Sequence, residues 1–344
     1  MKTIKINVSG FPNTFKLENW KIYNILKSKY NVEISDNPDY LFVSNFDKYS
    51  FCDFKGVRIY IQWECMFPNM NVVDYTINMV GDFKLQDRVF YYPNYAMVMG
   101  IEQISHKEKL PPDILKEKTG FCNYIYSHGG MKERTEIFHK ISEYKRVDSA
   151  GKYLNNMNGF TPGRREDVMG AINNFSKVDF QKKYKFTISF ENYKFPEYNT
   201  EKLAHAYMAN SIPIYYGDPL VTKHYNPKSF INCMEYESFD EVKERVKYLD
   251  THDDEYMEML NEPAFVNENQ LEELNKGLEN FLFSIFDQDY ESAFRRPRFF
   301  WPEIENNALL EYTRKAKKKD SVKRIIKKLP GVNYIVNKRR DISK

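Results

Sequence analysis

The sequence predicts an α/β protein with parallel sheets that is divided into two domains. The chain has 344 residues, which is more than one hydrophobic core of ordinary size fills. Apolar runs of strand length alternate with segments of helical periodicity, which is typical of parallel sheets covered by helices. Hydrophobic residues make up 42% and charged residues 29% of the chain, so a largely disordered protein is excluded.

The first third of the chain is expected to form one sheet, with a helix near residues 17–27. Strands are expected at three apolar runs, residues 3–8, 40–44 and 57–61. Glu64 closely follows the last of them and so lies just beyond a strand's carboxyl end, the edge at which open α/β sheets bind their ligands. The polar segment 102–120, which contains two adjacent prolines, is the expected linker. We therefore place a first domain at residues 1–115, a second at 116–300 and a C-terminal segment at 301–344.

The second domain is expected to contain two strand–turn–helix units. In the first, a strand at 121–127 leads into a helix at 131–143 that has Arg134 in its opening turn. In the second, a strand at 185–190 leads through a polar loop into a helix capped by Thr200, and then into a strand at 212–216. Because a strand's carboxyl end and a helix's amino end meet there, five side chains share one rim: Glu191, Asn192, Tyr198, Glu201 and Lys202.

Lys202 and Arg134 each lie in the first turn of an expected helix. A cation there opposes the helix dipole by roughly 0.3–1 kcal/mol, so its presence suggests a bound anion. For Lys202 alone a solvated surface lysine is an equal alternative, and the matching position of Arg134 favours a diphosphate site. The chain has no G-x-x-x-x-G-K-[ST] loop and no glycine-rich dinucleotide motif. The main sequence evidence for a P-loop ATPase is therefore missing.

Three segments of the second domain resemble the donor-binding signature of the α1,3-fucosyltransferases of glycosyltransferase family 10. They are Phe190-Glu191-Asn192, Tyr198-Asn199-Thr200-Glu201-Lys202-Leu203 and Ile212-Pro213-Ile214-Tyr215-Tyr216-Gly217. Phe121-Cys122-Asn123 and Lys145-Arg146-Val147-Asp148-Ser149 also look like blocks at the start of that family's donor domain. Upstream, Glu64 with Pro68-Asn69-Met70-Asn71 is similar to the acceptor-side segment of bacterial members.

The resemblance implies the GT-B fold, in which two Rossmann-like domains face each other across a cleft. It implies that fucose is transferred with inversion from GDP-fucose, the donor substrate, to a GlcNAc-containing oligosaccharide. Carried over by position, it implies that Glu64 is the base that deprotonates the acceptor hydroxyl.

The resemblance also implies roles at the donor. Arg134 and Lys202 would neutralise the departing diphosphate. Asn192 and Tyr198 would contact phosphate, and Glu201 would contact the ribose or the fucose. Guanine contacts are expected from residues 147–153.

Several of these residues also have an ordinary structural interpretation. Without the resemblance, Glu64 would be a surface carboxylate, Asn192 a turn residue and Tyr198 a packed aromatic. No metal site is expected, because fixed cations and a helix dipole can stabilise GDP as it leaves. Stimulation by Mn²⁺ or Mg²⁺ stays open. The adjacent pair Asp253-Asp254 is interpreted as solvated surface.

The basic charge of the chain is concentrated in residues 314–344. They hold thirteen Lys and Arg against two Asp, so this segment carries +11 and residues 1–313 carry −8. Apolar residues at helical spacing among these cations predict a basic amphipathic helix at 321–329, typical of a segment that lies on an anionic membrane surface. A solvated tail is the main alternative. No nucleic-acid partner is expected, because the rest of the chain has no basic surplus.

The chain is expected to be cytoplasmic, associated peripherally with the inner face of the cytoplasmic membrane. Its four cysteines lie far apart without metal-ligand spacing, so they are interpreted as buried free thiols of a reducing compartment. No apolar run approaches the ~18 residues of a spanning helix, and the first ten residues have no secretory pattern.

The sequence therefore predicts a membrane-bound fucosyltransferase that forms α1,3 linkages to GlcNAc in a LacNAc-type glycan, as in Lewis-type antigens or a surface polysaccharide. Three alternatives stay open: an α1,4 or dual α1,3/4 linkage, another nucleotide-sugar glycosyltransferase, and an inert glycan- or membrane-binding module. Acceptor choice depends on loops in residues 1–115 that the sequence does not specify.

Overall fold

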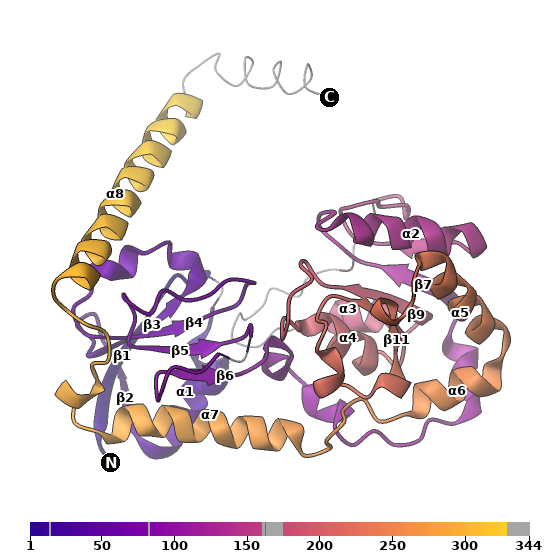
Figure 1. The fold of residues 1–344 in the computed structure, drawn as a ribbon, viewed down its shortest axis with the longest axis horizontal. Helices are drawn as coiled ribbons and strands as arrows, with labels where there is room; N and C mark the ends of the chain where they lie inside the picture. The colour runs from indigo at the N-terminus through magenta and orange to yellow at the C-terminus, as the bar shows by residue number, and fades with distance from the viewer. Residues whose placement is uncertain (14, 82, 160–161, 163–174, 329–344) are drawn as a thin grey trace.

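The computed structural model describes residues 1–13, 15–81, 83–159, 162 and 175–328. Two parallel sheets lie at the centres of two lobes, one built mainly from the first part of the chain and one from the middle part (Figure 1). The predicted α/β class with parallel sheets is confirmed.

The first sheet has six parallel strands in the order β2-β1-β3-β4-β5-β6. The strands are β1 (Thr3–Ser9), β2 (Asn31–Ile34), β3 (Tyr40–Ser44), β4 (Val57–Ile61), β5 (Tyr75–Asn78) and β6 (Val89–Tyr91). Every residue of β3, β4 and β5 is buried, as expected for parallel strands that are covered on both faces. The expected helix near 17–27 is a 3-10 turn (Leu17–Asn19) followed by α1 (Lys21–Lys29).

The second sheet has five parallel strands in the order β11-β10-β9-β7-β8. The strands are β7 (Gly120–Tyr124), β8 (Val147–Ser149), β9 (Tyr184–Phe190), β10 (Ile212–Tyr216) and β11 (Ile231–Asn232). The helices of this part of the chain are α2 (Lys132–Tyr144), α3 (Phe175–Gln181), α4 (Glu201–Met208), α5 (Phe239–Thr251) and α6 (Asp253–Asn261). The two expected strand–turn–helix units are therefore present as β7-α2 and β9-α4.

Helix α7 (Gln270–Asp287) packs on the first sheet although it follows the second in the chain. The ring of Phe281 lies 6.2 Å from that of Tyr75 and 5.5 Å from that of Phe90, measured between centroids. Lys2 Nζ donates to the carbonyl of Phe286 at 2.7 Å. The second domain expected at 116–300 is corrected accordingly, because the chain returns to the first lobe at α7 (Figure 1). An apolar helical stripe shows that a helix is buried but not which sheet it covers.

Helix α8 (Trp301–Lys328) lies against the first lobe over its first part and then projects from the molecule (Figure 1). Leu309 and Leu310 pack on an apolar cluster that includes residues of β3 and β4. Thr313 donates to the carbonyl of Lys48 at 2.5 Å. No helix in the described part of the chain has the length and apolar character that a bilayer-crossing helix needs.

Two polar anchors hold α8 and the segment before it. Glu305 accepts from the amide groups of Asn69 and Asn71 at 2.6 and 2.7 Å, so these two asparagines attach α8 to the loop after β4. The buried carboxylate of Asp74 accepts from the backbone N–H of Arg296 at 2.9 Å and from its guanidinium. The start of α8 is thereby fixed to the first lobe.

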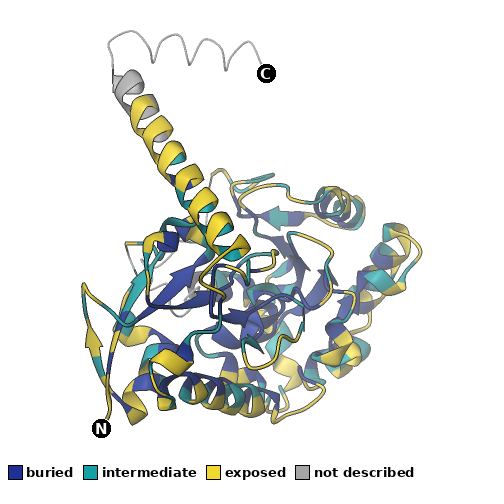
Figure 2. Ribbon diagram, turned by 60° about the vertical axis from the view of Figure 1, so that its left-hand side comes forward, coloured by how far each residue is buried: buried dark blue, intermediate teal, exposed yellow. Residues whose placement is uncertain are grey.

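The two lobes share an apolar contact. Helix α4 of the second lobe packs on two 3-10 turns of the first, Asn94–Met97 and Ile101–Ile104. The ring of Tyr225 lies 5.3 Å from that of Tyr95 in the first lobe and stacks on Tyr207 at 5.6 Å. One cluster of buried apolar residues contains side chains of both lobes, so the lobes meet through one continuous core. Figure 2 shows the buried residues in dark blue, mainly on the strands of the sheets.

Candidate functional site

Glu191 is the centre of a polar cluster between the carboxyl end of β9 and the start of α4. Its side chain is fully buried. One carboxylate oxygen accepts from the Thr200 N–H at 2.8 Å, and the other accepts from the Thr200 hydroxyl at 2.7 Å and from Lys202 Nζ at 2.9 Å. The expected side-chain cap of α4 by Thr200 is corrected, because its hydroxyl donates to Glu191 and forms no capping bond. Glu191 instead accepts from the N–H just before the helix.

Two glycines leave room for the charged side chains of this region. A Cβ atom at Gly217, just after β10, would lie 2.5 Å from Cγ of Glu191, closer than real Cβ contacts come. Gly130 has φ +63°, a conformation that glycine adopts readily, and a Cβ atom there would lie 2.6 Å from Nη1 of Arg134. A side chain at either position would displace a residue of the site.

Lys202 is held as a cation in the first turn of α4. Its Nζ donates to Glu191 and to Thr200 Oγ1, the latter at 2.7 Å, and lies 3.8 Å from Oε1 of Glu201. Burial lowers the pKa of Lys202, but Glu191 and Glu201 outweigh it and raise the pKa above its ordinary value. An ammonium has three N–H donors, and the described residues use two of them, so one is left for a ligand.

A second lysine, Lys177 of α3, adds charge to the same region. Burial raises the pKa of Glu201, but Lys202 and Lys177 outweigh it and hold that pKa well below the ordinary range. Burial lowers the pKa of Lys177 itself, and Glu201 opposes this shift. A small cavity between the two lysines is lined also by Tyr126 and Ser189. No sequence pattern pointed to Lys177, because it belongs to no motif.

Arg134 is buried in the first turn of α2 and joins this cluster from the other helix. Its Nη2 donates to the carbonyls of Phe190 and Glu191 at 2.9 and 2.6 Å and to Oδ1 of Asn192 at 2.9 Å. Its guanidinium lies over the ring of Tyr126, 4.1 Å from the centroid. No carboxylate among the described residues forms an ion pair with Arg134, so its charge is available to an anion.

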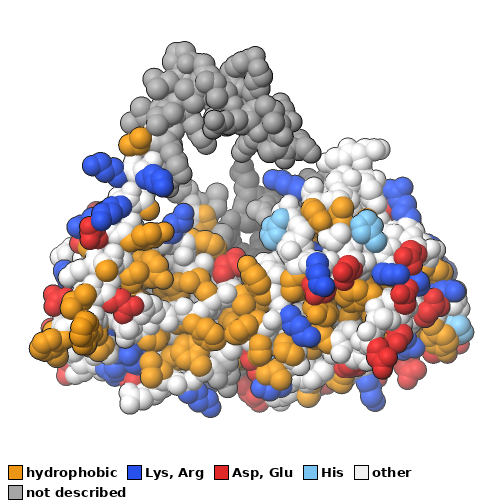
Figure 3. Space-filling view, turned by 45° about the horizontal axis from the view of Figure 1, so that its top comes forward, with side chains coloured by type: hydrophobic (Ala, Val, Ile, Leu, Met, Phe, Trp, Pro, Cys, Tyr) orange, Lys and Arg blue, Asp and Glu red, His pale blue; other side chains and the backbone are white. Residues whose placement is uncertain are grey.

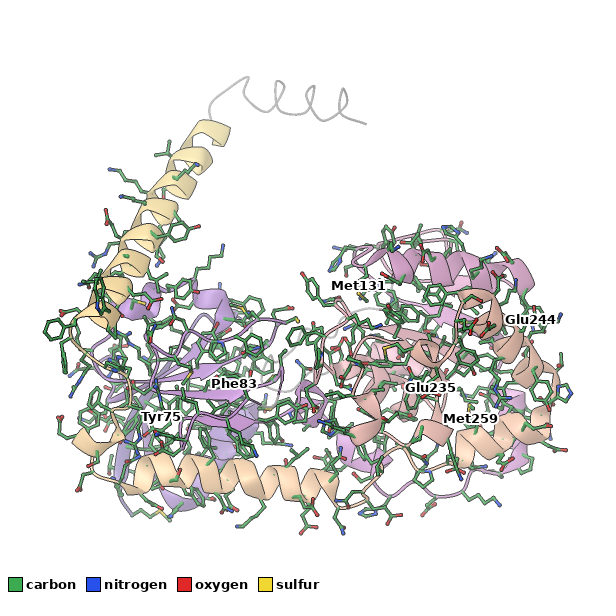
Figure 4. All side chains as sticks on the ribbon, in the orientation of Figure 1. Tyr75, Phe83, Met131, Glu235, Glu244 and Met259 are labelled. Atoms are coloured by element: carbon green, nitrogen blue, oxygen red, sulfur yellow. The ribbon has the colours of Figure 1, made fainter. Side chains whose placement is uncertain are left out.

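Glu64 approaches this cluster from the first lobe. It follows β4 and is half-buried. Burial raises the pKa of its carboxyl group, while the charge of Lys202 lowers it, that of Glu201 raises it and that of His128 lowers it. The loop that carries Glu64 contacts the second lobe, because the ring of Phe67 lies 5.7 Å from that of Phe195, in the loop between β9 and α4. Met131, labelled in Figure 4, precedes α2 on the side of the second lobe that faces the first.

Tyr198 lies at the end of the loop between β9 and α4, where its N–H donates to the carbonyl of Phe195 at 3.2 Å. It is 2% exposed, and burial together with the negative charges of Glu191 and Glu64 raises the pKa of its hydroxyl. The structure thus brings the six predicted site residues into one region: Glu64, Arg134, Asn192, Tyr198, Glu201 and Lys202. Sequence reasoning placed Glu191 on the rim but did not count it as a site residue, although it stands in the middle of the Phe-Glu-Asn segment.

Among the described residues, no group of three or more His, Cys, Asp or Glu side chains is arranged to hold a metal ion. Asp253 and Asp254 are exposed, as interpreted from the sequence, and Asp253 pairs with Lys185 at 3.1 Å. All four cysteines are free, but Cys65 is only half-buried, which corrects the expectation of four buried thiols. It stands beside Glu64 in the loop after β4.

Two family profiles match the chain. The profile described as glycosyltransferase family 10 (fucosyltransferase), C-term, matches residues 115–275. The profile of the alpha-(1,3)-fucosyltransferase FucT N-terminal domain matches residues 6–98. Protein R654 of Acanthamoeba polyphaga mimivirus is 30% identical, over 66% of this chain and 38% of its own length. The alpha-(1,3)-fucosyltransferase FucT of Helicobacter pylori is 27% identical, over 75% of this chain and 60% of its own length.

The chain therefore spans less than two thirds of the length of either relative. Among solved structures, a crystal structure of an α1,3-fucosyltransferase with GDP-fucose matches with a TM-score of 0.64 and 24% identity. The match covers 84% of this chain and 93% of that chain. A crystal structure of an α1,3-fucosyltransferase with GDP matches with a TM-score of 0.62 and 24% identity, over 81% of this chain and 91% of that one. These matches confirm the predicted GT-B fold.

Proposed function

Because the chain belongs to glycosyltransferase family 10, we propose that it transfers L-fucose from GDP-fucose to a GlcNAc-containing glycan. The observation that carries this proposal is that the loop of Glu64 in the first lobe contacts the β9–α4 loop of the second, to which Arg134 and Lys202 are hydrogen-bonded. We place the new linkage at the 3-hydroxyl of GlcNAc in a LacNAc-type glycan, as in Lewis-type antigens or a surface polysaccharide. The α1,3 linkage named for the Helicobacter pylori relative supports this choice.

Glu64 serves as the base of the transfer. The oxygen of the acceptor hydroxyl attacks C1 of fucose from the face opposite the diphosphate, and its proton passes to the Glu64 carboxylate. The bond between C1 and the β-phosphate oxygen breaks, and its electron pair leaves with GDP. Burial raises the pKa of Glu64 and makes it a better proton acceptor, while the charge of Lys202 favours the ionised form that the reaction needs.

Lys202 and Arg134 stabilise the charge that develops on the departing diphosphate. Both are fixed before the reaction, Lys202 by Glu191 and Arg134 by backbone carbonyls, so little reorganisation is needed. The amino end of α4 adds the positive end of its dipole. Asn192 and Tyr198 contact phosphate in this proposal. Glu201 contacts the ribose or fucose, and residues 147–153, which comprise β8 and the residues just after it, contact the guanine.

Lys202→Met is expected to weaken GDP-fucose binding about 10- to 100-fold, because it removes one hydrogen bond from a charged donor, ~1.5–3 kcal/mol. Calorimetric titration with GDP-fucose measures the change. The acid limb of the pH dependence of kcat should also move to higher pH, because Lys202 lowers the pKa of Glu64. Lys276→Met, at an exposed lysine of α7, is the control. Unchanged affinity with an unchanged acid limb would remove Lys202 from the site.

The activity itself is tested by incubating the purified chain with GDP-fucose and either N-acetyllactosamine or its type 1 isomer. Mass spectrometry of the products is expected to show fucose on the first acceptor, in α1,3 linkage. Product on the second acceptor alone would contradict α1,3 transfer and favour an α1,4 linkage. If the chain binds GDP-fucose but forms no product, the proposed acceptor is wrong. If the chain does not bind GDP-fucose, the proposed donor is wrong. Another nucleotide sugar as the donor, or an inert binding module, would then be favoured.

We also propose that the C-terminal segment, from residue 314 on, attaches the enzyme to an anionic surface at the inner face of the cytoplasmic membrane. Residues 329–344 and the side chains of residues 323–328, which include most of the expected amphipathic helix, lie outside the described residues. In the described part, basic side chains gather on the projecting end of α8 (Figure 3). Phe299, Phe300 and Trp301 at its start are 67%, 77% and 81% exposed, as expected for aromatic residues at a membrane interface.

Deletion of residues 321–344 is expected to reduce binding to vesicles that contain phosphatidylserine at least about tenfold, because each Lys or Arg near such a surface contributes ~1 kcal/mol. Eight Lys and Arg are removed, and the part of α8 that contacts the first lobe is kept. Vesicle sedimentation measures the change, with phosphatidylcholine vesicles as the control. Equal binding of the full and shortened chains to anionic vesicles would contradict the anchor.

A further inference from the structure

A groove lies on the first lobe between the loop after β3 and the docked part of α8. One wall is the 3-10 turn Asn45–Asp47 with the residues just after it, and the other is the face of α8 around Tyr312 and Lys317. The groove has a volume of about 660 Å³, which falls within the range of about 300–1,000 Å³ common for small-molecule sites. None of the six predicted site residues lines it.

Aromatic rings line the groove from both walls. Phe46 is 46% exposed and Tyr312 is 67% exposed, while Tyr49 and Tyr60 lie deeper. Exposed aromatic side chains that gather in one groove, unlike those scattered singly over a surface, are typical of a ligand-binding site. The rings are set on rigid elements, because Thr313, next to Tyr312, is bonded to the carbonyl of Lys48.

Polar groups interrupt the aromatic surface. Lys48 and Lys317 line the groove, and neither forms an ion pair with a residue that the structure describes. Lys48 and Tyr49 have φ values of 56° and 68°, a left-handed conformation that is uncommon for residues other than glycine. Such conformations concentrate at binding sites, where surrounding structure stabilises them.

The groove is continuous with the loop that carries Glu64. Met66 lines the groove two residues after Glu64, and its N–H donates to the Glu64 carbonyl at 2.8 Å. Asn45, in the opposite wall, accepts from the N–H of Trp63 at 2.9 Å. The backbone of Glu64 therefore lies within about 7 Å of Met66 in the lining of the groove, because two residues of chain can span no more than that.

We propose that this groove binds the sugar residues of the acceptor that extend beyond the fucosylated GlcNAc. The proposal rests on the proposed function and adds to it an extended acceptor subsite with α8 as one wall. Aromatic rings pack against the apolar C–H faces of sugar rings, and ammonium or amide groups bind sugar hydroxyls. An acyl chain fits less well, because Lys48, Lys317 and Asn45 break the apolar surface it would need.

The test compares an N-acetyllactosamine disaccharide with a hexasaccharide of three such units as acceptors. The enzyme is expected to have a KM about tenfold lower for the hexasaccharide. Phe46→Ala and Tyr312→Ala, one in each wall, should each raise that KM about five- to tenfold and so bring the two acceptors close together. Tyr248→Ala, the same change at an exposed tyrosine of α5, is the control and should keep the preference of the unmodified chain.

A preference for the hexasaccharide that survives both groove variants would overturn the subsite, as would equal KM values for the two acceptors in the unmodified chain. Failure of the proposed function gives a different result, namely no fucose on either acceptor. In that case saturation-transfer NMR with the hexasaccharide tests separately whether the groove binds the sugar. Contacts that vanish in Tyr312→Ala and persist in Tyr248→Ala would support it, and contacts equal in both variants would overturn it.

Discussion

Glu64→Gln is expected to lower kcat for fucose transfer about 10²–10⁴-fold, because the amide cannot take the proton of the acceptor hydroxyl. The substitution keeps the size of the side chain and removes no hydrogen bond that its carboxylate forms with the described residues. The affinity for GDP should therefore stay within about twofold. Single-turnover measurements with saturating GDP-fucose, together with a GDP titration, give the two quantities.

The pH dependence of kcat provides an independent check on Glu64. The base must be ionised, so activity is lost as the pH falls through its pKa, which burial raises above the ordinary value of 4.5. The remaining activity of Glu64→Gln should lack this acid limb. Glu311→Gln, at an exposed glutamate of α8 that pairs with Lys315, is the matched control. Turnover close to that of the unmodified chain in Glu64→Gln would eliminate Glu64 as the base.

Glu191→Ala is expected to destabilise the fold by about 3–5 kcal/mol and to abolish GDP-fucose binding. The change leaves the charge of Lys202 buried without its main partner, and breaking one side of a buried ion pair has an effect of this size. It also removes the acceptor of two donors of Thr200 at the start of α4. Urea unfolding measures the loss of stability, and calorimetry the loss of binding.

Two further variants separate charge from packing at this position. Glu191→Gln keeps an oxygen for the Thr200 N–H but loses the negative charge, so it should lie between the unmodified chain and Glu191→Ala in stability. Glu311→Ala, which removes an exposed ion pair, should change the free energy of unfolding by less than about 1 kcal/mol. If Glu191→Ala were no more destabilising than Glu311→Ala, the buried cluster would not hold α4 in place.

Much of the fold could be predicted because its central strands are short, mostly apolar segments. β3 and β4 match the expected segments 40–44 and 57–61, since strands buried on both faces leave a clear pattern in the sequence. The positions of Glu64 and Lys202 followed from the same pattern, because the ends of parallel strands and the starts of the following helices meet at one edge. Arg134 and Asn192 were placed by the same reasoning, and the resemblance to the donor-binding signature then suggested their roles.

The features that were missed depend on contacts between distant parts of the chain. The apolar stripe of α7 gave no indication that its partner is the first sheet. Thr200 has the residue type of a helix cap, but its hydroxyl is taken by Glu191, nine residues earlier in the chain. Lys177 has no local pattern at all, and only the packing of α3 beside α4 brings it to the site. Local propensity does not specify such contacts.

The return of the chain to the first lobe at α7 has a consequence for synthesis on the ribosome. The six strands of the first sheet are complete once β6 has emerged, yet the helix that covers Tyr75 and Phe90 ends roughly 200 residues later. At translation rates of about 5–20 residues per second, one face of this sheet stays uncovered for roughly 10–40 s. During that interval the nascent chain exposes an aromatic surface that a chaperone would recognise, and the second lobe has time to fold before the first is closed.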